Sequence, residues 1–180
     1  MANFSIPNST GLGAGSSQAA MTTTYKTLCL VGGSTGTTTV VGGGALRRGK
    51  LYDILIGTNG TPADNFMEFD VTRVTMGASS VLAGGISSVS SALGLDPADN
   101  SGFVAMAGIN SSIETAFTAT QEVWYVGINQ RASYRWVAAP GSEFVYPATS
   151  SATGGNGLAL RARSGGYTGT ATGNILFQEQ

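Results

Sequence analysis

The sequence contains no histidine and only one cysteine. Without histidine, the chain cannot build a Ser-His-Asp or Cys-His catalytic site, a histidine-ligated metal centre or the usual pH switch near neutrality. The single Cys29 cannot form a disulfide within the chain or a cysteine-rich zinc site. It lies in an apolar run of leucine and valine, which favours a buried, unreactive thiol. These absences argue against most classes of enzyme, and we expect no cofactor.

Charge is also scarce. Charged residues make up 11% of the 180 residues, whereas a soluble domain has about 25%. The net charge is −1, and a nucleic-acid-binding surface needs a basic stripe. We therefore expect no direct binding of nucleic acid. A chain with so little charge has only weak electrostatic repulsion from its own copies, which favours assembly.

Long apolar runs and a secretory signal are missing as well. No apolar stretch reaches the 18 residues of a membrane helix, and the first 25 residues carry no charged side chain. A secretory signal needs a positive segment ahead of an apolar one. We therefore expect a chain that neither spans a membrane nor is exported by that route.

The N-terminal residues differ in composition from the rest of the chain. Residues 1–20 are rich in glycine and serine and hold few large apolar groups, which predicts an extended or mobile arm. Residues 21–180 are long enough for a single domain with its own core. We expect the arm to become ordered only when Phe4, Ile6 and Pro7 dock on a neighbouring subunit.

The rest of the sequence has a pattern typical of β-strands. From residue 22 onward, short runs of β-branched and aromatic residues alternate with clusters of glycine, asparagine and proline. No segment combines a helix cap, a helical apolar stripe and sufficient length. The pattern predicts an all-β protein, an antiparallel jelly-roll-like β-sandwich of about seven to nine strands.

Alternation along these runs predicts which side chains face the core. In the run 132–138, Tyr134 and Trp136 share one face, while Arg131 and Arg135 lie on the other. The same alternation in three other runs predicts further side chains that face the core. The expected core anchors are Phe69, Tyr134, Trp136, Leu160 and Phe177.

Acidic residues offer one candidate for catalysis. Glu68 and Asp70 lie two apart on one strand face, and Asp53 or Asp64 could complete a glycosidase pair or a cation site with them. Carboxylates on a solvated strand face, or paired with arginines across strands, are far more common. We therefore predict no catalytic residue.

Two further motifs match ligand-binding patterns only in part. Asp96, Asp99 and Asn100 carry oxygens that suit calcium, but their spacing differs from that of an EF-hand and fits an ordinary turn. The glycine-rich stretches 11–15 and 32–36 lack the strand, helix or lysine that a dinucleotide or phosphate loop needs. We predict no metal-binding or cofactor-binding residue.

The later strands carry several arginines near aromatic residues, a combination that also holds oligonucleotides. The predicted parity, however, places the arginines and the aromatic rings on opposite faces, so no stacking platform is expected. Arginines on an outer face suit protein contacts. The candidate assembly contacts are therefore Phe4, Ile6, Pro7, Arg161 and Arg163.

Three segments carry a resemblance to a known class of protein. They are LYDILIGTNGTPADN at 51–65, LDPAD at 95–99, and NQRASYRWVAAPG at 129–141, which continues through PAT at 147–149, YTGTA at 167–171 and Phe177. In this order the segments resemble tailed-bacteriophage virion proteins that decorate or cement capsids. The resemblance covers about residues 50–180.

The resemblance implies a non-enzymatic virion structural protein, made in the host cytoplasm and located on the capsid exterior. Its expected partners are the major capsid protein, whose shell it would stabilise, and its own copies in a homotrimer. An alternative is a carbohydrate-binding β-sandwich module of a phage tail or fibre. A third interpretation is a small glycosidase.

The charge deficit and the resemblance together predict that the isolated protein is a homotrimer or larger. Sedimentation equilibrium at micromolar concentration should give at least three times the 18.2 kDa mass of the chain. A monomer mass under these conditions would contradict the prediction.

Overall fold

The computed structural model describes residues 3–8, 20–33, 48–59, 61, 63–77, 87–88, 93–96, 108–109, 118–146, 154–166 and 169–179. These residues contain twelve strands and no helix. The strands are β1 (Asn3–Pro7), β2 (Lys26–Gly33), β3 (Gly49–Asn59), β4 (Phe66–Gly77), β5 (Ser87–Ser88), β6 (Leu93–Gly94), β7 (Gly108–Ile109), β8 (Thr118–Asn129), β9 (Tyr134–Val137), β10 (Phe144–Tyr146), β11 (Gly154–Arg163) and β12 (Thr170–Glu179).

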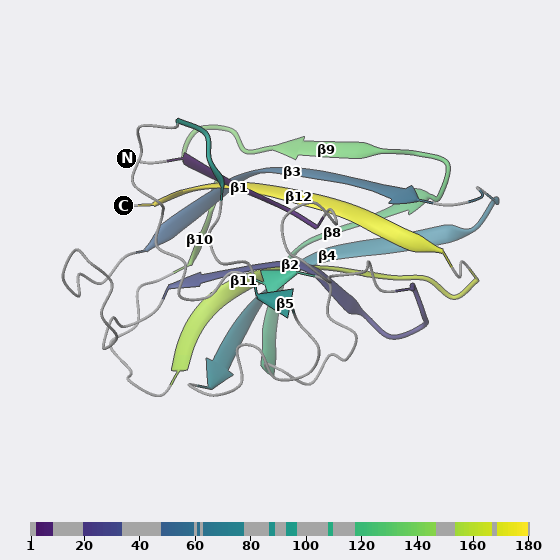
Figure 1. Ribbon diagram of the computed structural model, residues 1–180, viewed down its shortest axis with the longest axis horizontal. Helices are drawn as coiled ribbons and strands as arrows, with labels where there is room; N and C mark the ends of the chain where they lie inside the picture. Colours follow the sequence, from purple (N-terminus) through teal and green to yellow (C-terminus); the bar gives the residue numbers. More distant parts are fainter. Residues whose placement is uncertain are drawn as a thin grey trace.

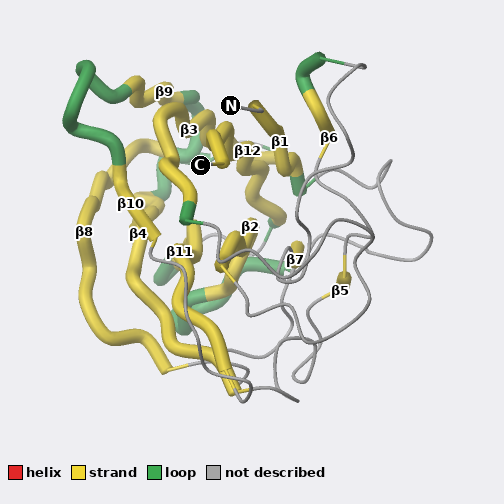
Figure 2. The backbone as a smooth tube through the Cα atoms, turned by 90° about the vertical axis from the view of Figure 1, so that its left-hand side faces the viewer, coloured by secondary structure: helices red, strands yellow, loops and turns green. Residues whose placement is uncertain are grey.

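The strands form two antiparallel sheets that pack face to face (Figures 1 and 2). Sheet A has the order β10-β3-β12-β1-β6, with β9 also paired to β3, and sheet B has the order β5-β7-β2-β11-β4-β8. The predicted all-β antiparallel sandwich is therefore confirmed. Nine of the strands have three residues or more, which agrees with the expected strand number.

Strand β12 shows why the sequence folds in this way. Its residues alternate strictly between half-buried and buried, as expected for a strand with one face on the core. Ala171, Ile175 and Phe177 face sheet B, while Asn174 and Leu176 face outward. β12 pairs with β1 on one side and with β3 on the other, so it lies at the centre of sheet A.

The core lies between the two sheets. Sheet A contributes Phe4, Ile54 and Phe177, and sheet B contributes Phe69 and Leu160, all at most 1% exposed. Three of the expected core anchors, Phe69, Leu160 and Phe177, thus lie in the interior. Large apolar side chains from both sheets fill the same space, and their burial is the main favourable contribution to folding.

The N-terminal residues are not an arm where the structure describes them. β1 pairs with β12 from Asn3 to Pro7, and Phe4 and Ile6 are each 1% exposed. The Phe4 ring lies 5.5 Å from that of Phe177. The prediction of an arm is therefore wrong for residues 3–8, because β12 provides backbone hydrogen bonds and the core provides an apolar site. Residues 9–19 lie outside the described residues.

This placement also corrects two of the candidate assembly contacts. Phe4 and Ile6 fill the chain's own core, so they cannot dock on a neighbouring subunit without unfolding β1. Pro7 is half-buried at the end of β1. Asn8, the next residue, is buried: its Nδ2 donates to the carbonyl of Ala171 at 2.9 Å, and its Oδ1 accepts from the amide of Gly173 at 2.8 Å.

Strand β9 corrects another prediction. Tyr134 and Trp136 lie opposite Ile56 and Ile54 of β3 and share their inward side, as the parity indicates. Tyr134 is nevertheless 39% exposed and is not a core anchor. The reason is that β9 lies at the margin of sheet A, where the inward side is only partly covered. Trp136 is half-buried and packs against the core.

We expect Phe4→Ala to lower the free energy of unfolding by about 3–5 kcal/mol, because the substitution removes a buried ring and leaves a cavity. Deletion of residues 1–8 should destabilise the chain further. Urea unfolding monitored by tryptophan fluorescence measures both effects, and Val137→Ala, at a 57% exposed position, is the control. If the truncated chain kept full stability, β1 would be dispensable and the arm interpretation would return.

Candidate functional site

A cluster of charged and aromatic side chains lies on the outer face of sheet B. Glu68 and Asp70 on β4 stand opposite Arg163 and Arg161 on β11. Arg161 Nε donates to Asp70 Oδ1 at 2.9 Å, its Nη2 donates to Asp70 Oδ2, and Arg163 Nε donates to Glu68 Oε2. Both guanidinium groups also lie over the ring of Tyr25, at 4.4 and 4.6 Å from its centroid.

The cluster is an internal ion-pair network. The side chain of Asp70 is fully buried, and that of Arg161 is 13% exposed. Burial raises the pKa of Asp70, while the hydrogen bond and charge of Arg161 oppose that rise. Burial, together with the charge of Asp70, raises the pKa of Tyr25 to about 12. The buried Asp70 carboxyl thus lies beside the guanidinium group that opposes the rise of its pKa.

The other two carboxylates of the possible glycosidase site lie apart from this network. Asp53, on the outer face of sheet A, accepts two hydrogen bonds from Arg135 Nε at 3.0 and 3.2 Å. Asp64 pairs with Arg131 at 2.9 Å. Asp53 and Asp64 therefore bind arginines of their own, and the structure does not join them to Glu68 and Asp70 in one site.

The candidate metal and loop motifs are placed only in part. Within the residues that the structure describes, no group of three or more acidic or cysteine side chains could hold a metal ion. Asp96 is exposed, whereas Asp99 and Asn100 lie outside those residues. The stretch 11–15 also lies outside them, and Gly32 and Gly33 form the end of β2.

The structure places Arg161 and Arg163 differently from each other. Arg161 is held between Asp70 and Tyr25 within its own chain. The Arg163 side chain is 42% exposed, so part of it is accessible to a partner. Of the candidate assembly contacts, Arg163 is thus the most accessible, although it already binds Glu68.

β8 lies near β9 and β10 at one side of the sandwich (Figure 2). Aromatic side chains from these three strands contact one another there. Trp124 lies 6.2 Å from Tyr134 and 6.5 Å from Trp136, which stacks on Phe144 at 4.5 Å. Trp124, Trp136 and Phe144 are half-buried against the core. Sequence reasoning missed the role of Trp124, although its alternation with Val126 and Ile128 indicates an inward position.

The outer face of sheet A carries exposed apolar side chains. Leu55 on β3 is 47% exposed and Val137 on the neighbouring β9 is 57% exposed. Leu176 on β12 is half-buried on the same side. Sequence reasoning did not identify this surface, because which strands are neighbours in a sheet cannot be deduced from alternation alone.

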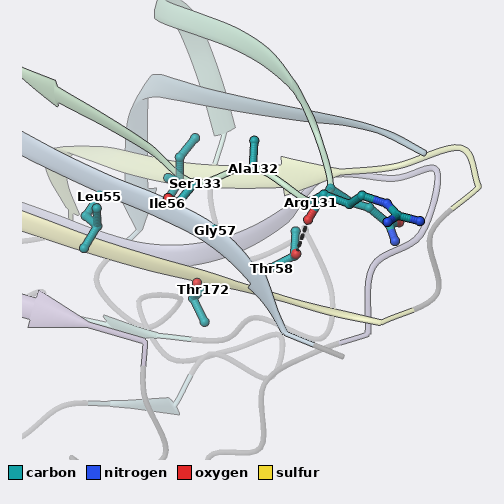
Figure 3. A pocket seen from close by; sticks show the side chains of 9 residues that line it. Leu55, Ile56, Gly57, Thr58, Arg131, Ala132, Ser133 and Thr172 are labelled. Carbon is teal, nitrogen blue, oxygen red and sulfur yellow. Dashed lines mark hydrogen bonds between the residues drawn. The ribbon is translucent and has the colours of Figure 1, made fainter. Parts of the chain in front are cut away.

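A hollow of about 390 Å³ opens on this face, between the end of β3 and the turn from β8 to β9 (Figure 3). Ser133 and Thr172 contribute hydroxyls, and Leu55 contributes an apolar wall. A Cβ on Gly57 would lie 3.1 Å from Thr172 Oγ1. A larger residue at this position would therefore fill part of the hollow. Figure 3 shows the Arg131 side chain extending away from Leu55 and Ser133. The hollow is therefore lined mainly by uncharged groups, with the Arg131 guanidinium at one end.

Comparison with known proteins adds no family to this description. No protein-family model, no curated protein and no solved structure matches the chain. The resemblance to capsid-decorating phage proteins therefore stays a prediction. Within the described residues, the structure also contains no helix of the length and apolarity needed to cross a membrane.

We expect Arg161→Met to lower the free energy of unfolding by about 3–5 kcal/mol at neutral pH, because it leaves the buried Asp70 carboxylate unpaired. A carboxyl whose pKa is raised on folding favours the folded state most at acid pH, and loses that contribution as the pH rises through its folded-state pKa. The difference in free energy of unfolding between the wild type and the variant should therefore shrink towards pH 4.

Unfolding in urea at pH 4 and pH 7 measures this dependence. The matched control is Arg131→Met, which breaks a pair whose side chains are 58% and 76% exposed and should cost at most about 1 kcal/mol. Equal losses in the two variants, or a deficit for Arg161→Met that grows in acid, would contradict the assignment.

Proposed function

We propose that this chain is a non-enzymatic virion structural protein that binds the outside of a phage capsid shell as a homotrimer and stabilises it. The observation that carries the proposal is the scarcity of charge. Only 11% of the residues are charged, and four of the arginines are paired with carboxylates of the same chain. A surface with so few charges is expected of a protein that copies and partners cover.

The strand order supports this proposal. Apart from the two-residue strands β5, β6 and β7, sheet A has the order β1-β12-β3, with β9 and β10 paired to different parts of β3, and sheet B has the order β2-β11-β4-β8. Counted with β9 and β10 as one strand, this is the distribution of an eight-stranded jelly roll, a fold that occurs in viral capsid proteins and in lectins. The fold is compatible with several functions, so the proposal also relies on the segments that resemble capsid-decorating proteins.

The proposed mechanism is mass action. Each bound copy would add interface free energy to the closed shell and raise the cost of opening it against packed DNA. Interfaces of about 1,600 Å² suffice when they are repeated by symmetry. With so few charges, apolar and backbone contacts would provide the attachment, since an exposed ion pair contributes about 0–1 kcal/mol.

The hollow on sheet A favours a second candidate, a carbohydrate-binding module of a tail or fibre. Hydroxyl groups beside an apolar wall can bind the hydroxyls and the C–H face of a sugar ring, and jelly rolls include lectins. Negative-stain imaging of native particles with a gold-labelled chain separates the two candidates. Labels on the head favour the capsid function, and labels on the tail favour the carbohydrate module.

Particles that lack the protein should assemble but release DNA at a lower temperature than decorated particles, because only the stability of the closed shell has changed. Re-decoration with purified protein should restore the release temperature, at both low and high salt. Access of a fluorescent dye to packaged DNA, measured against temperature, checks both expectations. Equal release temperatures with and without the protein would reject the capsid function, and release of the protein by moderate salt would show that charges hold it.

A further inference from the structure

A second hollow lies on the outer face of sheet B, where β4 begins and β11 ends. It has a volume of about 200 Å³, and its lining residues are Thr23, Phe66, Glu68, Arg163, Ser164 and Gly165. Pockets for drug-sized ligands hold about 300–1,000 Å³. The hollow on sheet B therefore suits a smaller ligand, of the size of a single ring.

The Phe66 side chain forms an apolar wall of this hollow. Its ring reaches from β4 to β8, since a Cβ on Gly127 would lie 2.1 Å from Phe66 Cζ and 2.4 Å from Phe66 Cε2. The ring thus rests on the backbone of Gly127, yet Phe66 remains 57% exposed. An aromatic ring that is held in place and exposed offers a ligand a flat surface on which to stack.

A charged pair stands beside the ring. Glu68 follows Phe66 on the same face of β4 and accepts a hydrogen bond from Arg163 Nε. The side chains of Glu68 and Arg163 are 21% and 42% exposed, so solvent reaches both. A guanidinium group has five N–H donors, and towards the described residues Arg163 uses only the one at Nε. The pair thus retains donors for a ligand.

Tyr125 on β8 extends the aromatic surface. The register places Glu68 one row away from Phe66 and one row away from Tyr125. Burial, and next the charge and the hydrogen bond of Glu68, raise the pKa of Tyr125. Glu68 therefore lies between two aromatic side chains that are both accessible.

The charges around the hollow are nearly balanced, which argues against an ionic ligand. Three carboxylates and two guanidinium groups interact with Tyr25, which gives the cluster a net charge of −1. Phosphate groups would meet this negative charge. A cationic ligand would compete with the two guanidinium groups that already lie over the Tyr25 ring. A wholly apolar ligand would desolvate the Glu68–Arg163 pair without offering it new hydrogen bonds.

We propose that the hollow on sheet B binds the ring of a neutral hexopyranose, a sugar residue of a glycan. One face of such a ring carries C–H groups that can stack on Phe66, and its edge carries adjacent hydroxyls. These hydroxyls can donate to Glu68 and accept from Arg163. The inference goes beyond the function proposed above and does not depend on it.

The hollow on sheet A matches this ligand less well. Among the described residues that line it, none is aromatic, so it offers no ring on which a sugar can stack. Its charged group, Arg131, is paired with Asp64. The two hollows lie on opposite faces of the sandwich, and binding to one can therefore be distinguished from binding to the other.

The first experiment titrates the purified, isotope-labelled chain with the methyl glycosides of glucose, galactose, mannose and N-acetylglucosamine. Amide NMR spectra report binding residue by residue. At least one glycoside should shift the signals of Thr23, Glu68 and Gly165 until they saturate, with a Kd of about 1 mM, as expected for a ligand of this size. The signals of Gly57 and Ser133, in the hollow on sheet A, should not move.

Two matched substitutions test the stacking surface. Phe66→Leu keeps an apolar side chain beside Gly127 but removes the flat ring, and it should weaken binding at least about tenfold. Tyr134→Leu makes the same change at a 39% exposed position of sheet A and should leave the Kd within about twofold. Thermal unfolding first establishes that both variants fold. If Phe66→Leu does not, Arg163→Lys replaces it, because lysine keeps the charge but loses the planar set of donors, and it should also weaken binding about tenfold.

A thymidine tetranucleotide is titrated in parallel. The inference is wrong if none of the four glycosides shifts the signals of Thr23, Glu68 and Gly165 at about 50 mM, or if Gly57 and Ser133 respond instead. It is also wrong if the tetranucleotide acts at a lower concentration than every glycoside, because the rings then stack on bases. Equal losses of affinity in Phe66→Leu and Tyr134→Leu would overturn it as well. The capsid function is tested separately, on particles, and stands or falls on that result.

Discussion

The close approach of the two sheets at Gly173 is the constraint on which the rest of the structure depends. A Cβ at this position would lie 2.9 Å from Leu160 Cδ2 and 3.1 Å from Leu28 Cδ1, both from sheet B. On the same spot the buried thiol of Cys29 donates to the carbonyls of Ile6 and Gly173 at 3.2 and 3.5 Å, and burial raises its pKa. Because Gly173 has no side chain, β12 can pack closely against Leu160 of β11 and Leu28 of β2 at this position.

The outer faces of the two sheets carry the charged side chains of the described strands in different arrangements. On sheet B, charged side chains neutralise each other in adjacent strands and are partly covered by Tyr25. On sheet A, the described strands carry the Asp53–Arg135 ion pair and, near one end of the face, Lys50. Both faces expose apolar side chains, Leu55 and Val137 on sheet A and Phe66 and Tyr125 on sheet B.

Much of the fold could be predicted from the sequence, because alternation in strands such as β4 and β12 is nearly complete. Two predictions failed, and one ion pair could not be foreseen, for physical reasons that involve distant partners. Phe4 and Ile6 stand among polar residues and find their apolar environment only beside β12, some 170 residues later. Tyr134 lies on the inward side of its strand, but it is exposed because β9 lies at the edge of sheet A. Arg161 pairs with Asp70 because β11 lies beside β4, and strand neighbours are not encoded in local periodicity.

The pairing of β1 with β12 brings the first and last described strands together in one sheet, and both chain ends lie on the same side of the molecule (Figure 1). A chain that emerges from the ribosome therefore makes β1 long before its partner exists. Until β12 is made, β1 can pair only with the two-residue strand β6, and its other edge stays open. Contacts so distant in sequence close slowly. During synthesis, then, β1 stays exposed to wrong pairing until β12 has been made.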